Sequence, residues 1–372
     1  MITTVVIKTN RACNLRCGYC YYINEATERY GETISLDTVE MLYHHLSDHV
    51  PPDQSVRLIW HGGEPMMIGP RRFLRFLELQ REYFKRPPLN SIQTNGTIWN
   101  PAWIELIQHY SVEIGLSIDG PADVHNRKRP DIRGRGTFGA LREFTDTLNY
   151  FEIPWGALTV VADDFVGAGY FKTLDLLGAS SCDLLPVMRF HGAPDTDETA
   201  RIRMIAEVLR LYREWRDHWQ DRFLVRLFAS YIGGLAGHPS VFANTGMSPE
   251  AFRSFVVLET DGSICTDVEF SEIERASGAP HYTLGRAVFD RDFSFANVVE
   301  ELDRRDRMFG LTALSEGCLG CDFSSACGGG HPGSRYSLLR NDFQSRSAHC
   351  DLMAALGITV RSDLQSIGYG GN

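Results

Sequence analysis

Short apolar runs alternate with amphipathic stretches along the first two thirds of the chain. The runs at 3–9, 56–60, 90–94, 112–119, 155–161 and 183–190 have the length and residue types of buried strands. Between them, apolar residues recur at helical spacing in 36–49, 70–84, 101–109, 137–150 and 198–220. Six strand–helix units in this order predict a parallel sheet covered by its crossover helices. They are too few for a closed barrel, so we expect an open, curved partial (β/α)6 barrel of the α/β class, with its site at the carboxyl ends of the strands.

The pattern changes after about residue 235. Residues 236–250 have the composition of a linker, and 255–268 (FVVLETDGSICTDV) predict a hairpin that turns at Asp261-Gly262. The remaining cysteines follow this hairpin. We therefore expect a barrel domain at 1–235, a linker at 236–250, a small second domain at 251–360 and a tail at 361–372.

Composition excludes several classes of protein. The 372 residues carry a formal charge of −10, which argues against a nucleic-acid binder that works through phosphate contacts. No apolar run approaches the ~18 residues of a membrane span, and the N-terminus lacks the features of a secretion signal. Nine cysteines in such a chain are better read as metal ligands or reactive thiols than as disulfides. We expect a cytoplasmic protein.

Three of the cysteines lie within eight positions, in the segment RACNLRCGYCYY that follows the first predicted strand: Cys13, Cys17 and Cys20. Three thiolates in one short loop can hold three irons of a [4Fe–4S] cluster and leave the fourth iron open to a ligand. A zinc site is the alternative, but it would need a fourth ligand nearby. The nearest histidines, His44 and His45, fall on a predicted helix.

Glycine-rich polar segments stand at the ends of the next three predicted strands: HGGEP (61–65), QTNG (93–96) and SIDG (117–120). Each segment alone is typical of a turn. Because they recur at one end of one sheet, they indicate a shared site that the backbone can approach closely.

These motifs resemble those of the radical S-adenosylmethionine (SAM) enzymes, and the likeness continues through HNRKR (125–129) and GRGTF (134–138). The resemblance implies a [4Fe–4S] cluster on the three cysteines, with SAM chelating its open iron. Reductive cleavage of SAM would give a 5′-deoxyadenosyl radical, which abstracts a hydrogen atom from the substrate. Position by position, the implied SAM contacts are Tyr19 near the adenine, Gly62, Gly63 and Glu64 at the amino group, Ser117 and Asp119 at the ribose, Arg129 at the carboxylate, and Gln93, Thr94 and Asn95 along the pocket.

The C-terminal cysteines provide four thiolates, enough to close a cluster completely: Cys318, Cys321, Cys327 and Cys350. Zinc is again the alternative reading. With the CGGG stretch, the spacing resembles the SPASM or twitch type of auxiliary iron–sulfur domain. His331 stands where that family has a further cysteine, so we expect one auxiliary [4Fe–4S] cluster rather than two. Cys265 is either a leftover or a substrate-facing thiol, and Cys182 is expected in the core.

The tail CGGGHPGSRYS…NDFQSRSAHCDL resembles the cyclophane-forming radical SAM/SPASM peptide maturases, with sulfatase-maturing enzymes as more distant relatives. The resemblance implies a C–C crosslink in a precursor peptide. Two alternatives remain open: tailoring of a small molecule such as a nucleoside or sugar, for instance by sulfur insertion, and sulfatase-type protein maturation. A third hypothesis, from a different functional class, is a non-catalytic module that binds an iron–sulfur cluster or zinc. The resemblance also implies a reducing partner such as a flavodoxin or ferredoxin. We expect no nucleic-acid or membrane partner.

Overall fold

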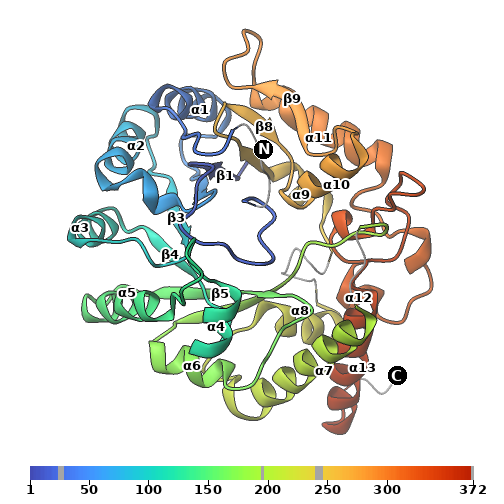
Figure 1. Cartoon of the computed structure of the whole chain (residues 1–372). Helices are drawn as coiled ribbons and strands as arrows, with labels where there is room; N and C mark the ends of the chain where they lie inside the picture. The colour runs from blue at the N-terminus through green and yellow to red at the C-terminus, as the bar shows by residue number, and fades with distance from the viewer. Residues whose placement is uncertain (24–28, 194–196, 239–245, 370–372) are drawn as a thin grey trace.

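The computed structural model describes residues 1–23, 29–193, 197–238 and 246–369. Strands form an arc at the centre of the molecule, helices α1, α2, α3 and α5 lie outside it, and the C-terminal part lies along the open side (Figure 1). None of the helices in the described part of the chain has the length and apolar character needed to cross a membrane.

Six parallel strands form the wall of the barrel, and each pairs with its neighbours in chain order. They are β1 (Thr4–Lys8), β2 (Arg57–His61), β3 (Leu89–Thr94), β4 (Glu113–Ser117), β5 (Trp155–Val161) and β6 (Ser181–Pro186). Each lies within or next to an apolar run of the sequence. The predicted (β/α)6 partial barrel is confirmed.

The covering helices are α1 (Leu36–His49), α2 (Pro70–Tyr83), α3 (Pro101–Tyr110), α5 (Phe138–Tyr150), α6 (Tyr170–Leu177) and α7 (Glu198–Glu214). Local sequence sets several of their ends. The hydroxyl of Ser35 accepts a hydrogen bond from the Thr38 N–H at the start of α1, and the side chain of Asn100 caps α3 in the same way. Pro70 and Pro101 occupy first-turn positions, where a missing N–H costs nothing.

Three features of the helices differ from the prediction. The short helix α4 (Ala122–Lys128) and helix α6 have too few turns for their periodicity to stand out. The helix expected over 198–220 is α-helical only to Glu214, and Trp215–Trp219 continues as a π-helical turn. The indole N–H of Trp215 donates to the Phe223 carbonyl at 2.7 Å, which ties this turn to the chain that follows it.

The predicted hairpin is present, but it belongs to the barrel sheet. Strand β7 (Phe255–Leu258) pairs in parallel with β1, and β8 (Ser263–Cys265) and β9 (Thr283–Ala287) extend the sheet antiparallel. The turn falls at Asp261-Gly262, where Gly262 has a φ of 88°. One nine-stranded sheet thus crosses the predicted boundary at 236–250, part of which lies outside the described residues. The domain limits stay a prediction.

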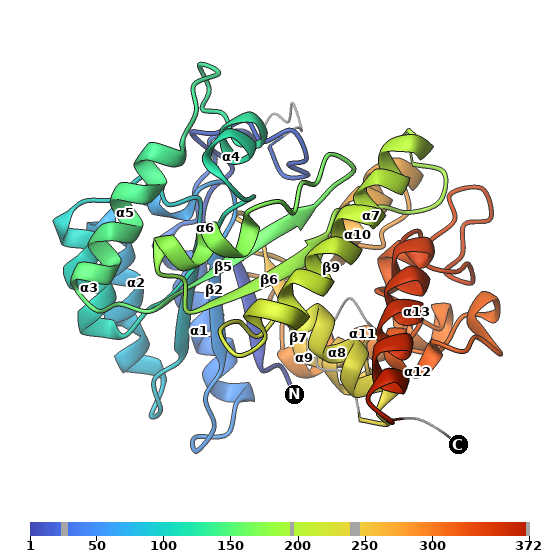
Figure 2. The same ribbon diagram turned by 90° about the horizontal axis from the view of Figure 1, so that it is seen from below.

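The rest of the C-terminal part is built from short helices and loops. It comprises α9 (Pro249–Ser254), α10 (Glu269–Ser277), α11 (Phe295–Phe309), α12 (Ser324–Cys327) and α13 (Cys350–Ser366), with short 3₁₀ turns at Glu316–Cys318 and Pro332–Arg335. In the barrel, a further 3₁₀ turn at Pro65–Ile68 follows β2, and α8 (Arg226–Leu235) is the last helix. Helix α13 packs against α7 and α8, and α12 packs against α8 (Figure 2). The second cysteine group is therefore fastened to the last helices of the barrel.

Candidate active site

The loop after β1 carries three partly buried thiols: Cys13, Cys17 and Cys20. The start of this loop contacts the segment Gly62-Gly63, which follows β2. The Gly63 N–H donates to the Asn10 carbonyl at 2.9 Å, and the Glu64 N–H donates to the Ala12 carbonyl at 2.8 Å. A Cβ on Gly63 would stand 1.9 Å from the Ala12 oxygen, so only glycine permits this approach. Two motifs that are distant in sequence thus form one backbone unit.

Glu64 is fully buried at the end of this unit. Its carboxylate accepts hydrogen bonds from the Thr94 hydroxyl at 2.6 Å and from the backbone N–H of Asn95 at 2.9 Å and of Met66 at 3.0 Å. Burial raises the pKa of Glu64, and these hydrogen bonds oppose the rise. The strand-end motifs of β2 and β3 therefore hold one carboxylate beside the cysteine loop.

Tyr19, Asp119 and Arg129 form a second buried network. The Asp119 carboxylate accepts from the Tyr19 hydroxyl at 2.5 Å and from Arg129 Nε at 2.9 Å, and Arg129 Nη1 lies 3.9 Å from Cys17 Sγ. Burial on its own raises the pKa of Asp119, but Arg129 and Tyr19 outweigh it, so the pKa lies below its usual value. This carboxylate stays charged and fixes the guanidinium next to the cysteine loop.

A cavity of about 270 Å³ brings these groups together. All the cysteines of the loop line it, with every predicted SAM contact except Asp119: Tyr19, Gly62, Gly63, Glu64, Gln93, Thr94, Asn95, Ser117 and Arg129. Asp119 is completely buried and lies behind Tyr19 and Arg129. Asp119 therefore positions the side chains of Tyr19 and Arg129. Its contact with the ribose of SAM stays a prediction. The opposite wall is apolar, with Leu158, Val160 and Leu185.

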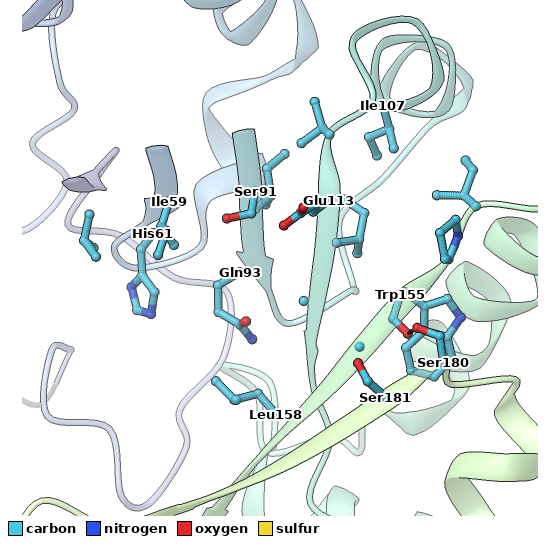
Figure 3. Close-up of a pocket in the computed structure, with 18 of the residues that line it drawn as sticks. Ile59, His61, Ser91, Gln93, Ile107, Glu113, Trp155, Leu158, Ser180 and Ser181 are labelled. Carbon is cyan, nitrogen blue, oxygen red and sulfur yellow. Dashed lines mark hydrogen bonds between the residues drawn. The ribbon is translucent and has the colours of Figure 1, made fainter. Parts of the chain in front are cut away.

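A second cavity, of about 980 Å³, fills the interior of the barrel. It shares five lining residues with the smaller cavity: His61, Gln93, Leu158, Leu185 and Glu269. In Figure 3, His61, Gln93 and Leu158 project from β2, β3 and β5 toward the same space, while Ser91 and Glu113 lie nearer the amino ends of β3 and β4. The two cavities meet at this shared wall, where the larger one offers room for a substrate.

Lys8 and His61 were not singled out as site residues in the sequence. Lys8 Nζ is fully buried, donates to the Tyr21 hydroxyl at 2.9 Å and lies 3.4 Å from His61 Nδ1. Burial lowers the pKa of Lys8 to about 8, although Glu259 opposes the shift. Burial and the neighbouring Lys8 place the pKa of His61 well below its usual value. Both residues stand at the carboxyl ends of their strands, and that position could have identified them as site residues from the sequence.

His331 reaches the interior of the barrel from the C-terminal part. Its Nδ1 lies 2.9 Å from Glu269 Oε2, and its Nε2 lies 3.6 Å from Asp267 Oδ2. Burial lowers the pKa of His331, but the two carboxylates dominate and raise it to about 10. The Gly333 N–H approaches the same Nδ1 at 3.1 Å, and a protonated nitrogen cannot accept it, so the carboxylate is the effective partner. His331, which stands where the SPASM family has a cysteine, is therefore an imidazolium paired with carboxylates.

The second cysteine group lies between the Glu316–Cys318 turn and α13. The pKa of Cys327 is raised in part by Cys318 and Cys350, and the pKa of Cys350 in part by Cys318 and Cys321, which places the four thiols within electrostatic range. Burial raises the pKa of Cys327 to about 11. Arg335, from the SRYS segment, is buried beside them and donates to the carbonyls of Leu311 and Ala313 ahead of Cys318. Arg335 therefore fastens the loop that leads to the first of these cysteines.

The last two cysteines are core residues. Cys182 lies on β6 and Cys265 on β8, and both are buried in the hydrophobic core. The prediction for Cys182 is confirmed. Cys265 lines an outer cavity with Tyr22 and Tyr282, away from the thiols of the cysteine loop.

The two cysteine groups differ from a site for a single metal ion. Among the described residues, no three His, Cys, Asp or Glu side chains converge closely enough to bind a single metal ion. Tetrahedral zinc needs its ligands within about 2.3 Å of one point. A [4Fe–4S] cluster takes one thiolate at each of several separated irons, so it does not require such convergence on one point.

Comparison with known proteins agrees with this geometry. Residues 7–157 match the Radical SAM superfamily. The chain is 28% identical over 269 residues to a serine-type anaerobic sulfatase-maturating enzyme of Klebsiella aerogenes, a match that covers 68% of this chain and 63% of that enzyme. It is also 28% identical over 345 residues to a cysteine-type anaerobic sulfatase-maturating enzyme of Clostridium perfringens, with 88% of each chain covered.

Solved structures show the same fold. The structure of native anSMEcpe with bound AdoMet superimposes with a TM-score of 0.81 at 20% identity, over 98% of both chains. Streptococcus suis SuiB bound to S-adenosylmethionine gives a TM-score of 0.60 at 15% identity, over 94% of this chain and 77% of that one. The particular likeness to cyclophane-forming maturases stays a prediction. Residues 7–157 thus form a radical SAM domain, and members of that superfamily use a [4Fe–4S] cluster and SAM.

Proposed function

We propose that the chain is a peptide-modifying radical SAM enzyme that forms an oxidative crosslink, most simply a C–C bond, in a ribosomal precursor peptide. The observation that carries this proposal is the pair of joined cavities. The smaller one, lined by the three thiols of the cysteine loop, shares His61, Gln93 and Glu269 with a larger one of about 980 Å³. A volume of that size, at the upper end of small-molecule pockets, accommodates several side chains of a peptide.

The residues of the smaller cavity have roles that follow from their chemistry. Cys13, Cys17 and Cys20 would hold the cluster, which with SAM supplies the radical chemistry. Buried Glu64 offers an anionic acceptor for an ammonium group, and Arg129, held by Asp119, offers a cation for a carboxylate. The apolar wall of Leu158, Val160 and Leu185 excludes water from the space between SAM and substrate.

The four C-terminal thiols would hold one auxiliary [4Fe–4S] cluster, and residues 251–360 would form the domain around it. Where a second auxiliary cluster would need a thiol, the chain has His331, which is paired with Asp267 and Glu269. Each of the two cysteine groups would thus serve one cluster.

Sulfatase-type maturation is the second candidate. It is favoured by the names of the curated relatives and by anSMEcpe, whose structure has been determined with a bound Cp18Cys peptide. The match spans less than two thirds of the Klebsiella enzyme, and its activity is not transferred to this chain on that basis. Both candidates act on a peptide.

The test uses anaerobically reconstituted enzyme, SAM, dithionite and, as the probe, synthetic peptides translated from any short reading frames next to the gene. We expect roughly eight irons per chain, formation of 5′-deoxyadenosine, and a peptide lighter by two hydrogens whose fragmentation stops between the linked residues. The triple variant Cys13→Ala, Cys17→Ala, Cys20→Ala should keep about half of the iron and make no 5′-deoxyadenosine.

Cys182→Ala is the matched control, since it removes a buried thiol that belongs to neither group, and it should leave the iron count unchanged. A product aldehyde that reacts with a hydrazide would favour sulfatase-type oxidation over a crosslink. SAM cleavage by the triple variant would contradict the assignment of the cluster.

A further inference from the structure

Exposed arginines gather on the outer side of the cysteine loop, although the chain as a whole carries a charge of −10. They are Arg16 in the loop itself, Arg127 on α4, and Arg133 and Arg135 in the segment that follows α4. The Asp131 carboxylate is already engaged by the backbone amides of Arg133 and Arg135 and by the Arg135 side chain. Within the described part of the chain, Arg127 and Arg133 form no ion pair. Four arginines against the one aspartate give this patch a net positive charge.

This patch is bonded directly to the loop that carries the thiols. The Arg16 N–H donates to the Pro130 carbonyl at 2.8 Å, and the Ile132 N–H donates to the Asn14 carbonyl at 3.1 Å. In Figure 2, α4 and the segment after it lie at the top of the view beside the blue loop. From the same segment, Arg129 reaches to 3.9 Å from Cys17 Sγ. The segment that carries the exposed arginines therefore also contacts one of the thiols.

The patch also has an apolar centre. Ile132 is 59% exposed and Tyr30 is 50% exposed, and Arg16 Nη2 donates to the Tyr30 hydroxyl at 3.3 Å. Exposed apolar side chains rimmed by arginines are the usual composition of a protein-binding surface. A small ligand would instead need a concave pocket, and none of the cavities described above is lined by Arg127, Arg133 or Ile132.

We propose that this surface, formed by Arg16, Arg127, Ile132, Arg133 and Arg135 with Tyr30, docks a small acidic one-electron donor protein of the flavodoxin or ferredoxin class. The inference rests on the proposed function, because an electron must reach the cluster before SAM is cleaved. Electron transfer slows steeply with distance, and this surface lies over the cysteine loop. Opposite charges speed the encounter of such partners and orient them.

The test compares two reductants on the reconstituted enzyme. In Arg127→Glu/Arg133→Glu, the rate of 5′-deoxyadenosine formation with a flavodoxin system should fall about tenfold or more. With dithionite, which needs no docking surface, it should stay within about twofold. The wild-type rate with flavodoxin should also fall as salt rises from low ionic strength to 0.5 M, because exposed charges are then screened.

Arg213→Glu is the matched control, since it reverses an exposed arginine on α7 outside the patch, and it should behave as wild type with both reductants. Equal rates for wild type and the double variant with flavodoxin would overturn the docking surface, and so would a rate that is indifferent to salt. A loss with dithionite as well, together with a lower iron count, would mean that the two arginines maintain the cysteine loop instead. Failure of the wild type with both reductants would refute the proposed function itself.

Discussion

His331 is a buried imidazolium held between two carboxylates, Asp267 and Glu269. The three residues come from the chain after the hairpin and from the CGGG stretch, and they line the barrel interior together. Glu269 also lines the cavity of the cysteine loop. Because His331 follows Cys327 closely in the chain, the network ties the segment of the second cysteine group to the lining of the barrel interior, so its charges contribute to stability as well as to the polarity of the cavity.

Replacement of His331 by Gln should destabilise the fold in a pH-dependent way. Its pKa is raised from an ordinary value near 6.5 to about 10, so its contribution is fully present below pH 6.5 and disappears as the pH rises through 10. We expect a loss of about 3 kcal/mol at pH 6, shrinking toward pH 10, in urea unfolding of the purified chain. His218→Gln, at an exposed position in the π turn, is the control. An equal loss at both pH values would contradict the ion pair.

At the scale of elements, the cysteine loop is joined through its backbone to the strand-end motif of β2. Backbone hydrogen bonds join Asn10 and Ala12 to Gly63 and Glu64. The side chain of Asn10 adds a hydrogen bond to the Glu64 carbonyl at 2.8 Å. The loop that carries the thiols is therefore placed by β2 as much as by β1.

Gly63→Ala tests this junction. The new methyl group would stand 1.9 Å from the Ala12 carbonyl, so the cysteine loop must shift, and we expect loss of about half of the iron and of SAM cleavage. Gly139→Ala, in α5, meets no atom within 4 Å and should be neutral or stabilise by about 0.5–1 kcal/mol. Wild-type iron content and SAM cleavage in Gly63→Ala would show that the loop tolerates the displacement.

At the scale of the whole molecule, one sheet and one helix connect the two cysteine groups. Strand β7 extends the barrel sheet beside β1, and α13, which begins at Cys350, packs on α7 and α8. The second cysteine group is thus packed against the barrel. Ligation of Cys350 would close a long loop and fasten the C-terminal helix to the barrel.

Cys350→Ala should therefore act on stability and on turnover together. Because metal affinity is expressed as folding free energy, we expect a lower melting temperature and loss of about half of the iron. Formation of 5′-deoxyadenosine without peptide should persist, while formation of the crosslinked peptide should fall more than SAM binding does. Intact product, iron content and melting temperature would remove Cys350 from the site.

The sequence by itself determined the strands and helices of the barrel, the hairpin turn and the grouping of the cysteines. These features depend on the spacing of apolar residues and on residues close in the chain, which act locally. It also brought together the lining of the smaller cavity, since carboxyl ends of parallel strands share one edge. Short helices such as α4 and α6 left too little periodicity to be recognised.

Only the tertiary structure decided which distant segments meet. The parallel pairing of β7 with β1, the position of Asp119 behind Arg129, and the approach of His331 to Asp267 and Glu269 depend on how the whole sheet packs. The same holds for the arginine surface over the cysteine loop, which joins segments more than a hundred residues apart. Contacts of this kind are selected by burial and charge compensation across the folded molecule, and no local pattern encodes them.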